Sequence, residues 1–368
     1  MPQLKVIVNK LNKRKGAVTD FSKKGNIVGT LTEGDVFKSV AEVTNNLGTW
    51  HIDENGFVVW AGGTAAQWTF DSNKMTWAHD SVVNGGLGVV DLWNELGVRG
   101  EGITVAILDS GLNSSLEDFT DSNIKYYNAF LDSSQKENCL DDSFGHGTDC
   151  CGILCGGGKS FYGVAPDISL LLIKITNQNG QRIPSAIVRG LERAIEMQSD
   201  VISMSFTIPQ DNNFQVVHDK IKDAFDKNIT VVASAGDSGG VGFPVNEFPA
   251  SFPECLSIGG INRQKLRSSA STLSDFLSLM GPGEELFSLT NPAQKIRGTS
   301  FSAPFVAGII AIVKSLAKRS ATQLSNVLLL DALKKAADKN FPEYNTLEYG
   351  SGIINAIATL QLLSFINS

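Results

Sequence analysis

The chain has 368 residues, of which 42% are hydrophobic and 19% charged, which is typical of a soluble globular protein with a large core. Its net charge of −7 argues against nucleic acid as a main partner, because phosphate backbones bind to basic surfaces. No stretch is long enough for a transmembrane span, so no membrane partner is expected.

The first 65 residues predict a small all-β domain, because short apolar runs alternate with turn residues. The patterns Gly-Thr-Leu-x-x-Gly-Asp, Gly-x-Trp and Gly-Phe-Val-x-Trp resemble bacterial Src-homology-3-like barrels, which bind peptides or cell-wall fragments. The resemblance implies a barrel at 1–65, a linker at 66–86 and a larger domain at 87–368. We expect strands at 27–31, 34–37, 48–52 and 57–60, with Asn55-Gly56 as a hairpin turn.

Two motifs in the first half of the larger domain carry side chains suited to proton transfer. Four apolar residues (105–108) precede Asp109-Ser110-Gly111, which predicts a buried parallel strand with a carboxylate at its C-terminal end. The segment Gly145-His146-Gly147-Thr148 predicts a helix that begins close to another part of the backbone, with an uncrowded imidazole. Taken singly, an Asp of this kind often only caps an element, and a lone histidine is more often structural.

A third motif, Gly298-Thr299-Ser300, precedes an apolar run at 305–310 that predicts a buried helix. A serine there lies beside free backbone N–H groups at the positive end of the helix dipole. That environment favours the negative charge that an attacked carbonyl develops in acyl transfer. In isolation the motif would indicate only an N-cap.

The chain order Asp, His, Ser resembles that of the subtilisin-like serine peptidases, over residues 87 to the C-terminus. The resemblance implies an α/β fold, with helices on both faces of a parallel sheet, and hydrolysis of peptide bonds in proteins or peptides. In such a triad Ser300 attacks, His146 acts as general base and then acid, and Asp109 orients the imidazole. Four further segments resemble the family's, namely those at 163–175, 200–205, 231–236 and 349–356.

The oxyanion position departs from the family pattern, because Asp237 stands where an asparagine is usual. An ionised carboxylate repels an oxyanion, whereas a protonated one can donate a hydrogen bond, as in the sedolisins that this Gly-Asp-x-Gly arrangement resembles. Three alternatives remain open. The site works with neutral Asp237 at mildly acid pH, works slowly at neutral pH with the Ser300 N–H and other donors, or binds peptides as a catalytically impaired protein.

The resemblance also places the substrate groove at Ser205, Phe206 and Thr207, where side chains replace the glycines usual in relatives and should narrow it. Acidic residues that would select basic substrates are not evident near these motifs. This favours an apolar or uncharged residue before the scissile bond.

The sequence predicts neither an organic cofactor nor a zinc site, since no histidine stands at metal-ligand spacing from the cysteines. The family's calcium loop corresponds to 156–160, which has no carboxylate or amide, so calcium is not expected there and stays open elsewhere.

The five cysteines form no evident disulfide framework, and the N-terminus lacks the apolar core of a secretory signal. We therefore expect a cytoplasmic protein, although removal of a leader would leave a similar N-terminus. An inhibitory propeptide is the alternative for the first 65 residues, but the amphipathic helices of that α/β fold are not evident.

Overall fold

The computed structural model describes residues 72–363 except 81–84, 121, 178, 212, 240–241 and 342–343, together with seven backbone strands among the first 71 residues. The chain divides into two compact units, each described by itself. One comprises Met1–Asp71 and Val90–Val98, and the other comprises Ser72–Val89 and Arg99–Ser368.

The first unit contains one sheet of seven strands in the order β3-β2-β6-β5-β4-β1-β7. Three of the predicted strands, at 27–31, 48–52 and 57–60, correspond to β3, β5 and β6, whereas the predicted 34–37 overlaps only the start of β4. The predicted Asn55-Gly56 turn lies outside the described residues. Closure into a barrel stays a prediction. The strands are β1 (Gln3–Val6), β2 (Lys10–Arg14), β3 (Ile27–Thr32), β4 (Val36–Asn45), β5 (Gly48–Asp53), β6 (Val58–Trp60) and β7 (Thr64–Gln67), and α1 (Val89–Leu96) follows them.

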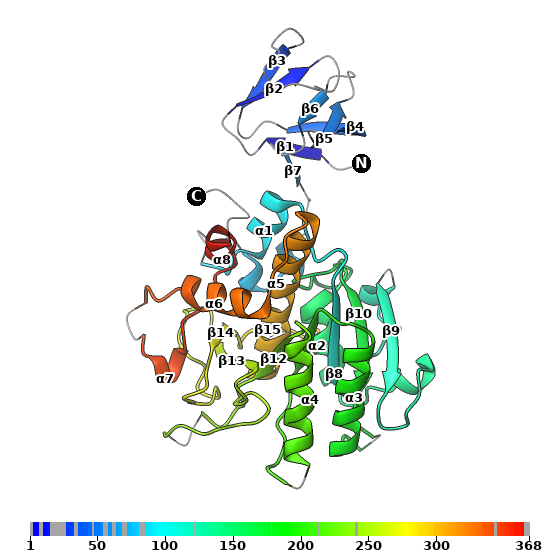
Figure 1. The fold of residues 1–368 in the computed structure, drawn as a ribbon, viewed down its shortest axis with the longest axis vertical. Coiled ribbons are helices and arrows are strands. Elements are labelled where there is room, and N and C mark those ends of the chain that lie inside the picture. The colour runs from blue at the N-terminus through cyan, green and yellow to red at the C-terminus, as the bar shows by residue number, and fades with distance from the viewer. Residues whose placement is uncertain are drawn as a thin grey trace. The chain divides into compact units, whose positions relative to one another are not determined.

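The second unit is built on a parallel sheet of seven strands in the order β14-β13-β12-β11-β8-β10-β9 (Figure 1). The central strands are almost wholly buried, which explains why their sequences are mostly apolar. This confirms the predicted α/β fold class. The strands are β8 (Thr104–Asp109), β9 (Asn123–Asn128), β10 (Ser169–Lys174), β11 (Val201–Met204), β12 (Thr230–Ser234), β13 (Cys255–Ile261) and β14 (Leu279–Pro282).

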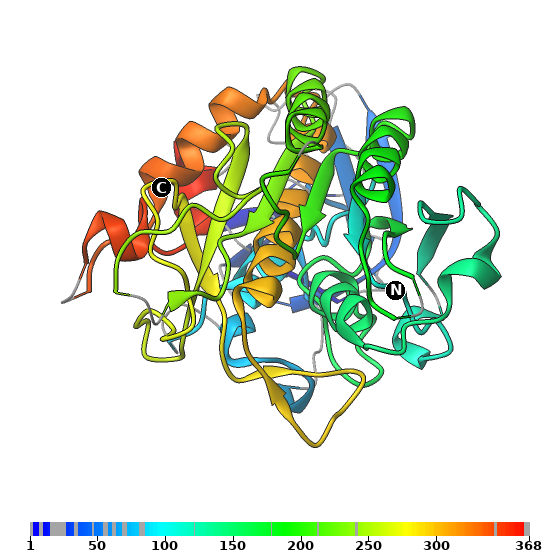
Figure 2. The same cartoon turned by 90° about the horizontal axis from the view of Figure 1, so that it is seen from below.

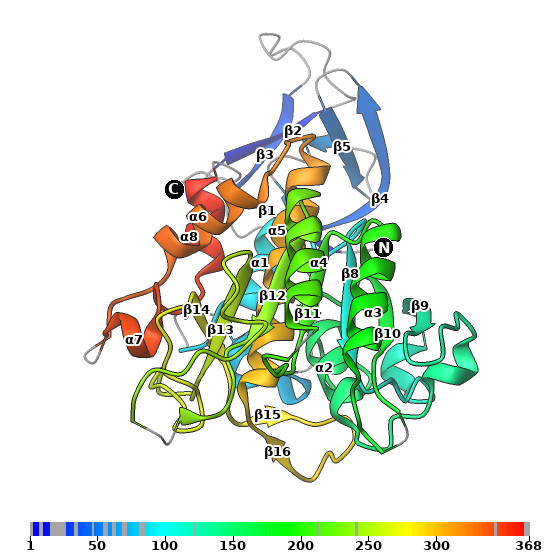
Figure 3. The same ribbon diagram turned by 60° about the horizontal axis from the view of Figure 1, so that its bottom comes forward.

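Helices cover both faces of this sheet. α3 (Pro184–Glu196) and α4 (Phe214–Asp226) pack side by side on one face, as Figure 3 shows, over a core that includes Leu191, Ile202 and Ile221. α2 (His146–Cys155) and α5 (Thr299–Arg319) pack together on the other face. The remaining helices are α6 (Asn326–Ala336), α7 (Thr346–Tyr349) and α8 (Ala356–Leu362).

Helix α5 is preceded by a short hairpin of β15 (Leu286–Phe287) and β16 (Lys295–Ile296), drawn in gold at the lower edge of Figure 2. Among the described residues, α5 alone has the length and hydropathy to cross a membrane. Its apolar window is 94% buried within the protein, as expected for a core helix. All five cysteines are free and buried, in agreement with the predicted absence of a disulfide framework.

The segment 72–80, within the range predicted as a linker, packs into the second unit. Trp77 is buried and its Nε1–H donates to the Glu284 carbonyl at 3.0 Å. His79 is 1% exposed, lies 3.0 Å from Thr76 Oγ1 through Nδ1, and sets its ring edge-to-face against Phe305. Burial lowers the pKa of His79 to about 4.

We expect His79 to make folding sensitive to acid. A histidine with a depressed pKa stays neutral in the folded state, whereas the unfolded chain takes up a proton below about pH 6.5. The free energy of unfolding is therefore not reduced by His79 above that pH. It falls as the pH drops towards 4, and protonation of His79 accounts for roughly 3 kcal/mol of the loss. Urea unfolding of the wild type and of His79→Asn at pH 7.5 and 4.5 measures the difference. Both proteins have the same carboxylates, so the acid sensitivity that these cause cancels in the comparison. Equal losses of stability in the wild type and in His79→Asn would contradict the role of His79.

Candidate active site

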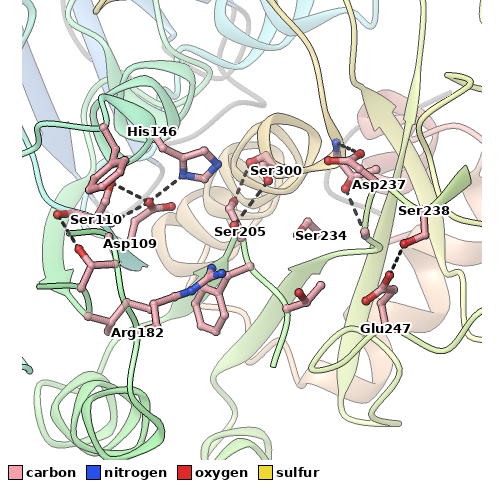
Figure 4. A pocket seen from close by; sticks show the side chains of 18 of the residues that line it. Asp109, Ser110, His146, Arg182, Ser205, Ser234, Asp237, Ser238, Glu247 and Ser300 are labelled. Atoms are coloured by element: carbon pink, nitrogen blue, oxygen red, sulfur yellow. Dashed lines mark hydrogen bonds and ion pairs between the residues drawn. The ribbon is translucent and has the colours of Figure 1, made fainter. Parts of the chain in front are cut away.

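The predicted site residues meet at the carboxyl edge of the parallel sheet. In the register of the sheet, Asp109 at the end of β8 pairs with Lys174, and Leu108 pairs with Met204, the last residue of β11. The strand ends therefore face the first turns of α2 and α5 across a cleft of about 570 Å³ (Figure 4). The cleft is lined by all the predicted site residues, namely Asp109, His146, Ser205, Phe206, Thr207, Asp237 and Ser300.

Asp109 and His146 form an ion pair at one end of this cleft. His146 Nδ1 lies 2.8 Å from Asp109 Oδ1, and the exposed fraction of the side chain is 5% for Asp109 and 34% for His146. Attraction to the Asp109 carboxylate raises the pKa of His146 well above its ordinary value, against the effect of burial. Burial raises the pKa of Asp109, but its attraction to His146 and the hydrogen bonds from His146 and Ser110 leave that pKa below the ordinary value.

Two buried polar groups hold the Asp109 turn in place. The Ser110 N–H donates to Asp109 Oδ1 at 2.7 Å. Lys174, 5% exposed, donates through Nζ to the carbonyls of Ser110 and Asp141. Asp109 Oδ2 is buried and has no hydrogen-bond partner among the described residues, so His146 is the main group that balances the carboxylate's charge.

The first turn of α2 is fixed against this strand end. Gly145 has φ +71°, and a Cβ at Gly147 would lie 2.3 Å from the Gly111 carbonyl oxygen, so both flanking glycines are required sterically. Asp142 accepts hydrogen bonds from the Thr148 N–H at 2.7 Å and from Ser110 Oγ at 2.7 Å. One carboxylate thus ties the start of α2 to the end of β8.

Ser300 is the second residue of α5 and is held through its carbonyl group. Pro304 lies four residues later and has no N–H to donate, so the Ser300 carbonyl lacks its usual helical donor. Ser205 Oγ donates to that carbonyl at 2.6 Å, and Cys150 Sγ lies 3.4 Å from it. These two side chains therefore fix the backbone of the serine to β11 and α2.

The Ser300 hydroxyl does not hydrogen-bond to His146 in the described structure. Its Oγ lies 3.5 Å from the Ser205 carbonyl oxygen, which is the limit for a hydrogen bond. The His146 ring packs on Phe301, the next residue along, with ring centroids 5.5 Å apart. The imidazole and the hydroxyl therefore line one cleft, as Figure 4 shows, and a rotation of Ser300 about χ1 is the movement available for contact.

Asp237 lies at the N-terminus of α5, where its side chain is exposed. Its Oδ1 accepts the Thr299 N–H at 3.0 Å, and Gly298, with φ +137°, leaves room for Oδ2. Among the described residues the Ser300 N–H has no acceptor, so it is free to donate into the cleft.

The sequence motifs missed several polar residues around the cleft. Asp142 precedes His146 by four positions, and its nearness in the chain was the one available signal. Arg182 lies over the buried Phe206 ring at 5.4 Å from the ring centroid, and Glu247 lies on the opposite side of the cleft (Figure 4). Both come from loops without a recognisable motif. Asp149, next to Thr148, anchors the segment before α5 by accepting the N–H groups of Leu289 and Thr290.

One group of metal-ligand side chains occurs among the described residues, formed by Asp109, His146 and Cys150, with ligand atoms within 4.8 Å of one another. Burial raises the pKa of the Cys150 thiol to about 11, so at neutral pH it is not the thiolate that metals bind. His146 Nδ1 is engaged by Asp109. The arrangement suits proton transfer better than metal binding.

The loop predicted to lack calcium, at 156–160, is held by a carboxylate from another segment. Asp118, 2% exposed, accepts the Ser160 N–H with both oxygens and the Phe161 N–H with Oδ1. These oxygens already serve backbone donors, so the donor set does not fit a cation.

Comparison of the sequence with known proteins identifies one family. A sequence model described as the subtilase family matches residues 100–352. The chain is 32% identical to the "Major intracellular serine protease" of Bacillus subtilis (strain 168) over 238 residues, which cover 62% of this chain and 73% of that protein. It is 34% identical to the "Intracellular serine protease" of Paenibacillus polymyxa, with coverage of 62% and 71%. It is 31% identical to "Subtilisin DY" of Bacillus licheniformis, with coverage of 72% and 93%.

Solved structures show the same fold. The prenylagaramide maturation protease PagA superimposes with a TM-score of 0.63 at 22% identity, over 75% of this chain and 98% of that one. The PatG macrocyclase domain gives a TM-score of 0.62 at 20% identity, over 75% and 95%. Both likenesses are structural.

The ion pair makes a testable prediction for His146. In Asp109→Asn the attraction that raises the His146 pKa is lost while the burial that lowers it remains. We expect the imidazole to lose its proton at a lower pH than in the wild type, by at least about one pH unit. NMR titration of histidine-labelled protein measures this shift. Asp141→Asn, which neutralises an exposed carboxylate nearby, is the matched control, and an unchanged His146 titration in Asp109→Asn would show that the pair is not coupled.

Proposed function

The chain belongs to the subtilase family, and on that premise we propose that it is a serine endopeptidase in which Asp109, His146 and Ser300 form the catalytic triad. The observation that carries the proposal is the Asp109–His146 pair, which lies in one cleft with a serine at the N-terminus of α5. The substrates are proteins or peptides. No organic cofactor takes part, and any calcium would bind away from residues 156–160.

The proposed roles of His146 and Ser300 follow from which of their polar atoms are not engaged by other groups. His146 uses Nδ1 for Asp109, which leaves Nε2 to take the proton of the Ser300 hydroxyl as it attacks the peptide carbonyl. The imidazolium then forms beside the Asp109 carboxylate, whose charge stabilises it, and returns the proton to the leaving amine. Ser300 Oγ must turn from the Ser205 carbonyl towards the imidazole when substrate binds, and catalytic hydrogen bonds of this kind often form only in the complex.

The oxyanion would be stabilised by the Ser300 N–H, which points to slow catalysis at neutral pH. An ionised carboxylate at Asp237, which accepts the Thr299 N–H, has no hydrogen to donate and would repel the developing negative charge. The alternative of a mildly acid optimum needs a proton on Asp237 while His146 has none. Attraction to Asp109 raises the pKa of His146, which works against the second condition. We therefore propose that activity rises with pH as His146 loses its proton.

The catalytically impaired alternative deserves a test because two observations favour it, namely the missing contact between Ser300 Oγ and His146 and the carboxylate at the oxyanion position. On this alternative the protein would bind peptides in the cleft without cleaving them. A fluorophosphonate probe that reacts with activated serines, applied at pH 5 and at pH 7.5, distinguishes the two.

The outer parts of the chain add two proposals. The strands of the first unit would form a small β-domain that binds peptides or cell-wall fragments. Two of the relatives are named as intracellular, and free buried cysteines suit a reducing compartment, so we propose that this protein acts in the cytoplasm.

Ser300→Ala should abolish peptide cleavage, by a factor of up to about 10⁶ as measured on subtilisin itself, because the nucleophile is lost. The fold should persist, since the carbonyl of residue 300 keeps its hydrogen bond from Ser205. Cleavage of a fluorogenic peptide and labelling by the fluorophosphonate probe are the measurements. If Ser300→Ala retained most of the rate, or the wild type were never labelled, the triad proposal would be wrong.

Asp237→Asn should raise kcat/KM at neutral pH, because it replaces a repelling carboxylate by an amide that donates a hydrogen bond. One such donor is worth about 10²–10³-fold, a value measured on the corresponding asparagine of subtilisin. The rise of activity with pH should remain, since it reports His146. If the wild type were instead fastest near pH 5 and Asp237→Asn lost that acid preference, the neutral-acid alternative would hold.

A further inference from the structure

One part of the cleft is not used by the chemistry proposed above. It lies between the ends of β11 and β12, and Figure 4 shows it on the Asp237 side of Ser300. We call it the inner pocket and define it by its lining residues Thr207, Ser234, Gly236, Ser238 and Glu247.

The inner pocket is open because its walls are small. Gly236 follows the end of β12 with φ +99°, and a Cβ there would lie 2.7 Å from Glu247 Cγ. The stem of Glu247 therefore packs directly on the backbone of Gly236. Ser234 and Ser238, which also have small side chains, line the same part of the cleft.

Glu247 is close to the nucleophile through two short contacts. The Gly236 N–H donates to Thr299 Oγ1 at 3.2 Å, and Thr299 directly precedes Ser300. Gly236 in turn touches the Glu247 stem. A substrate residue whose carbonyl is attacked by Ser300 has its Cα one bond from the carbonyl carbon, so its side chain begins beside this pocket.

The Glu247 carboxylate has only one hydrogen-bond partner in the described structure. Oε1 accepts the Ser238 hydroxyl at 2.6 Å, and Oε2 accepts nothing from the described residues. No described lysine, arginine or histidine forms a salt bridge with it, although it is half-buried. A half-buried carboxylate without a cation is stabilised by a positively charged ligand.

We propose that Glu247 selects substrates with lysine or arginine directly before the scissile bond. The inference rests on the proposed peptidase function, because it assumes that Ser300 attacks the carbonyl. The aliphatic stem of the lysine or arginine passes between Thr207 and Gly236, and its cationic head reaches Glu247 and the Ser238 hydroxyl oxygen.

The arginine that lines the cleft does not oppose this selection. Arg182 stacks over Phe206 on the side of the cleft that holds Asp109, and the strand end at Ser205 lies between it and Glu247 (Figure 4). The sequence motifs favoured an apolar or uncharged residue before the scissile bond because Glu247 lies outside them. That residue reaches the pocket from a loop ten positions beyond Asp237.

Matched peptides that differ only in the residue before the scissile bond test the proposal. The wild type should cleave the lysine and arginine peptides about 10- to 100-fold faster in kcat/KM than the glutamine or leucine peptides, as expected for a charge-assisted hydrogen bond. Glu247→Gln keeps the shape and a group that can pair with Ser238 but removes the charge, so the lysine-to-glutamine ratio should fall close to one. Glu247→Lys should reverse the preference towards glutamate.

Glu117→Gln is the control, because it removes an exposed carboxylate that does not line the cleft and should leave the lysine-to-glutamine ratio unchanged. A wild-type ratio near one, or a ratio that survives in Glu247→Gln, would overturn the role of Glu247 while leaving the peptidase function intact.

Equilibrium binding to Ser300→Ala decides the question without catalysis. Fluorescence anisotropy with labelled peptides should show that Ser300→Ala binds the lysine peptide more tightly than the glutamine peptide. This difference should vanish in the double variant that carries both Ser300→Ala and Glu247→Gln. If the wild type cleaves nothing but this difference is present, the peptidase proposal fails and the specificity of the pocket stands. Equal binding of both peptides would overturn the specificity.

Discussion

The shared register of the parallel strands is the constraint on which the site depends. Because β8, β11 and β12 run in the same direction and are paired residue by residue, their carboxyl ends lie together at one edge. Helices α2 and α5 begin at this edge, so an imidazole and a hydroxyl from distant segments line the same cleft as Asp109. The buried apolar runs of the strands make the register difficult to shift, since both faces are covered.

Within that frame, a missing helical hydrogen bond fixes the backbone of Ser300, the proposed nucleophile. Pro304 deprives the Ser300 carbonyl of its helical donor, and Ser205, directly after β11, and Cys150 from α2 supply polar contacts instead. A break in the regular pattern of one helix thereby joins three elements at the residue that must be placed most accurately. Ser205 lines the cleft, where the sequence predicts a substrate-binding residue, and its hydroxyl also holds the backbone of Ser300.

The fold and the motif residues were predictable because each signal is local. The apolar run that ends in Asp109 predicts a buried strand, and the glycines beside His146 predict a helix start in close contact with another backbone. Asp142, Lys174 and Glu247 were not predictable as members of the site, because their roles depend on which loops return to the cleft. No periodicity or spacing encodes that return. The segment 72–80 was predicted as part of a linker for a similar reason, since Trp77 and His79 acquire their partners from Glu284 and Phe305, more than two hundred positions away.

The carboxylates that line the cleft differ in the effect that we expect their negative charge to have on the reaction. Asp109 is buried next to His146, so in the proposed mechanism its charge would stabilise the imidazolium that forms during attack. Asp237 is exposed at the N-terminus of α5, and a negative charge there would raise the barrier to the proposed attack by Ser300. Glu247 lies farther along the cleft, where a substrate side chain rather than a reacting atom would meet it. A cationic side chain bound at Glu247 would bring positive charge to the Asp237 side of Ser300, and this would partly offset the repulsion from Asp237. On these two proposals, substrate selection and catalysis would be coupled through electrostatics, and a basic residue before the scissile bond should benefit the chemical step as well as binding.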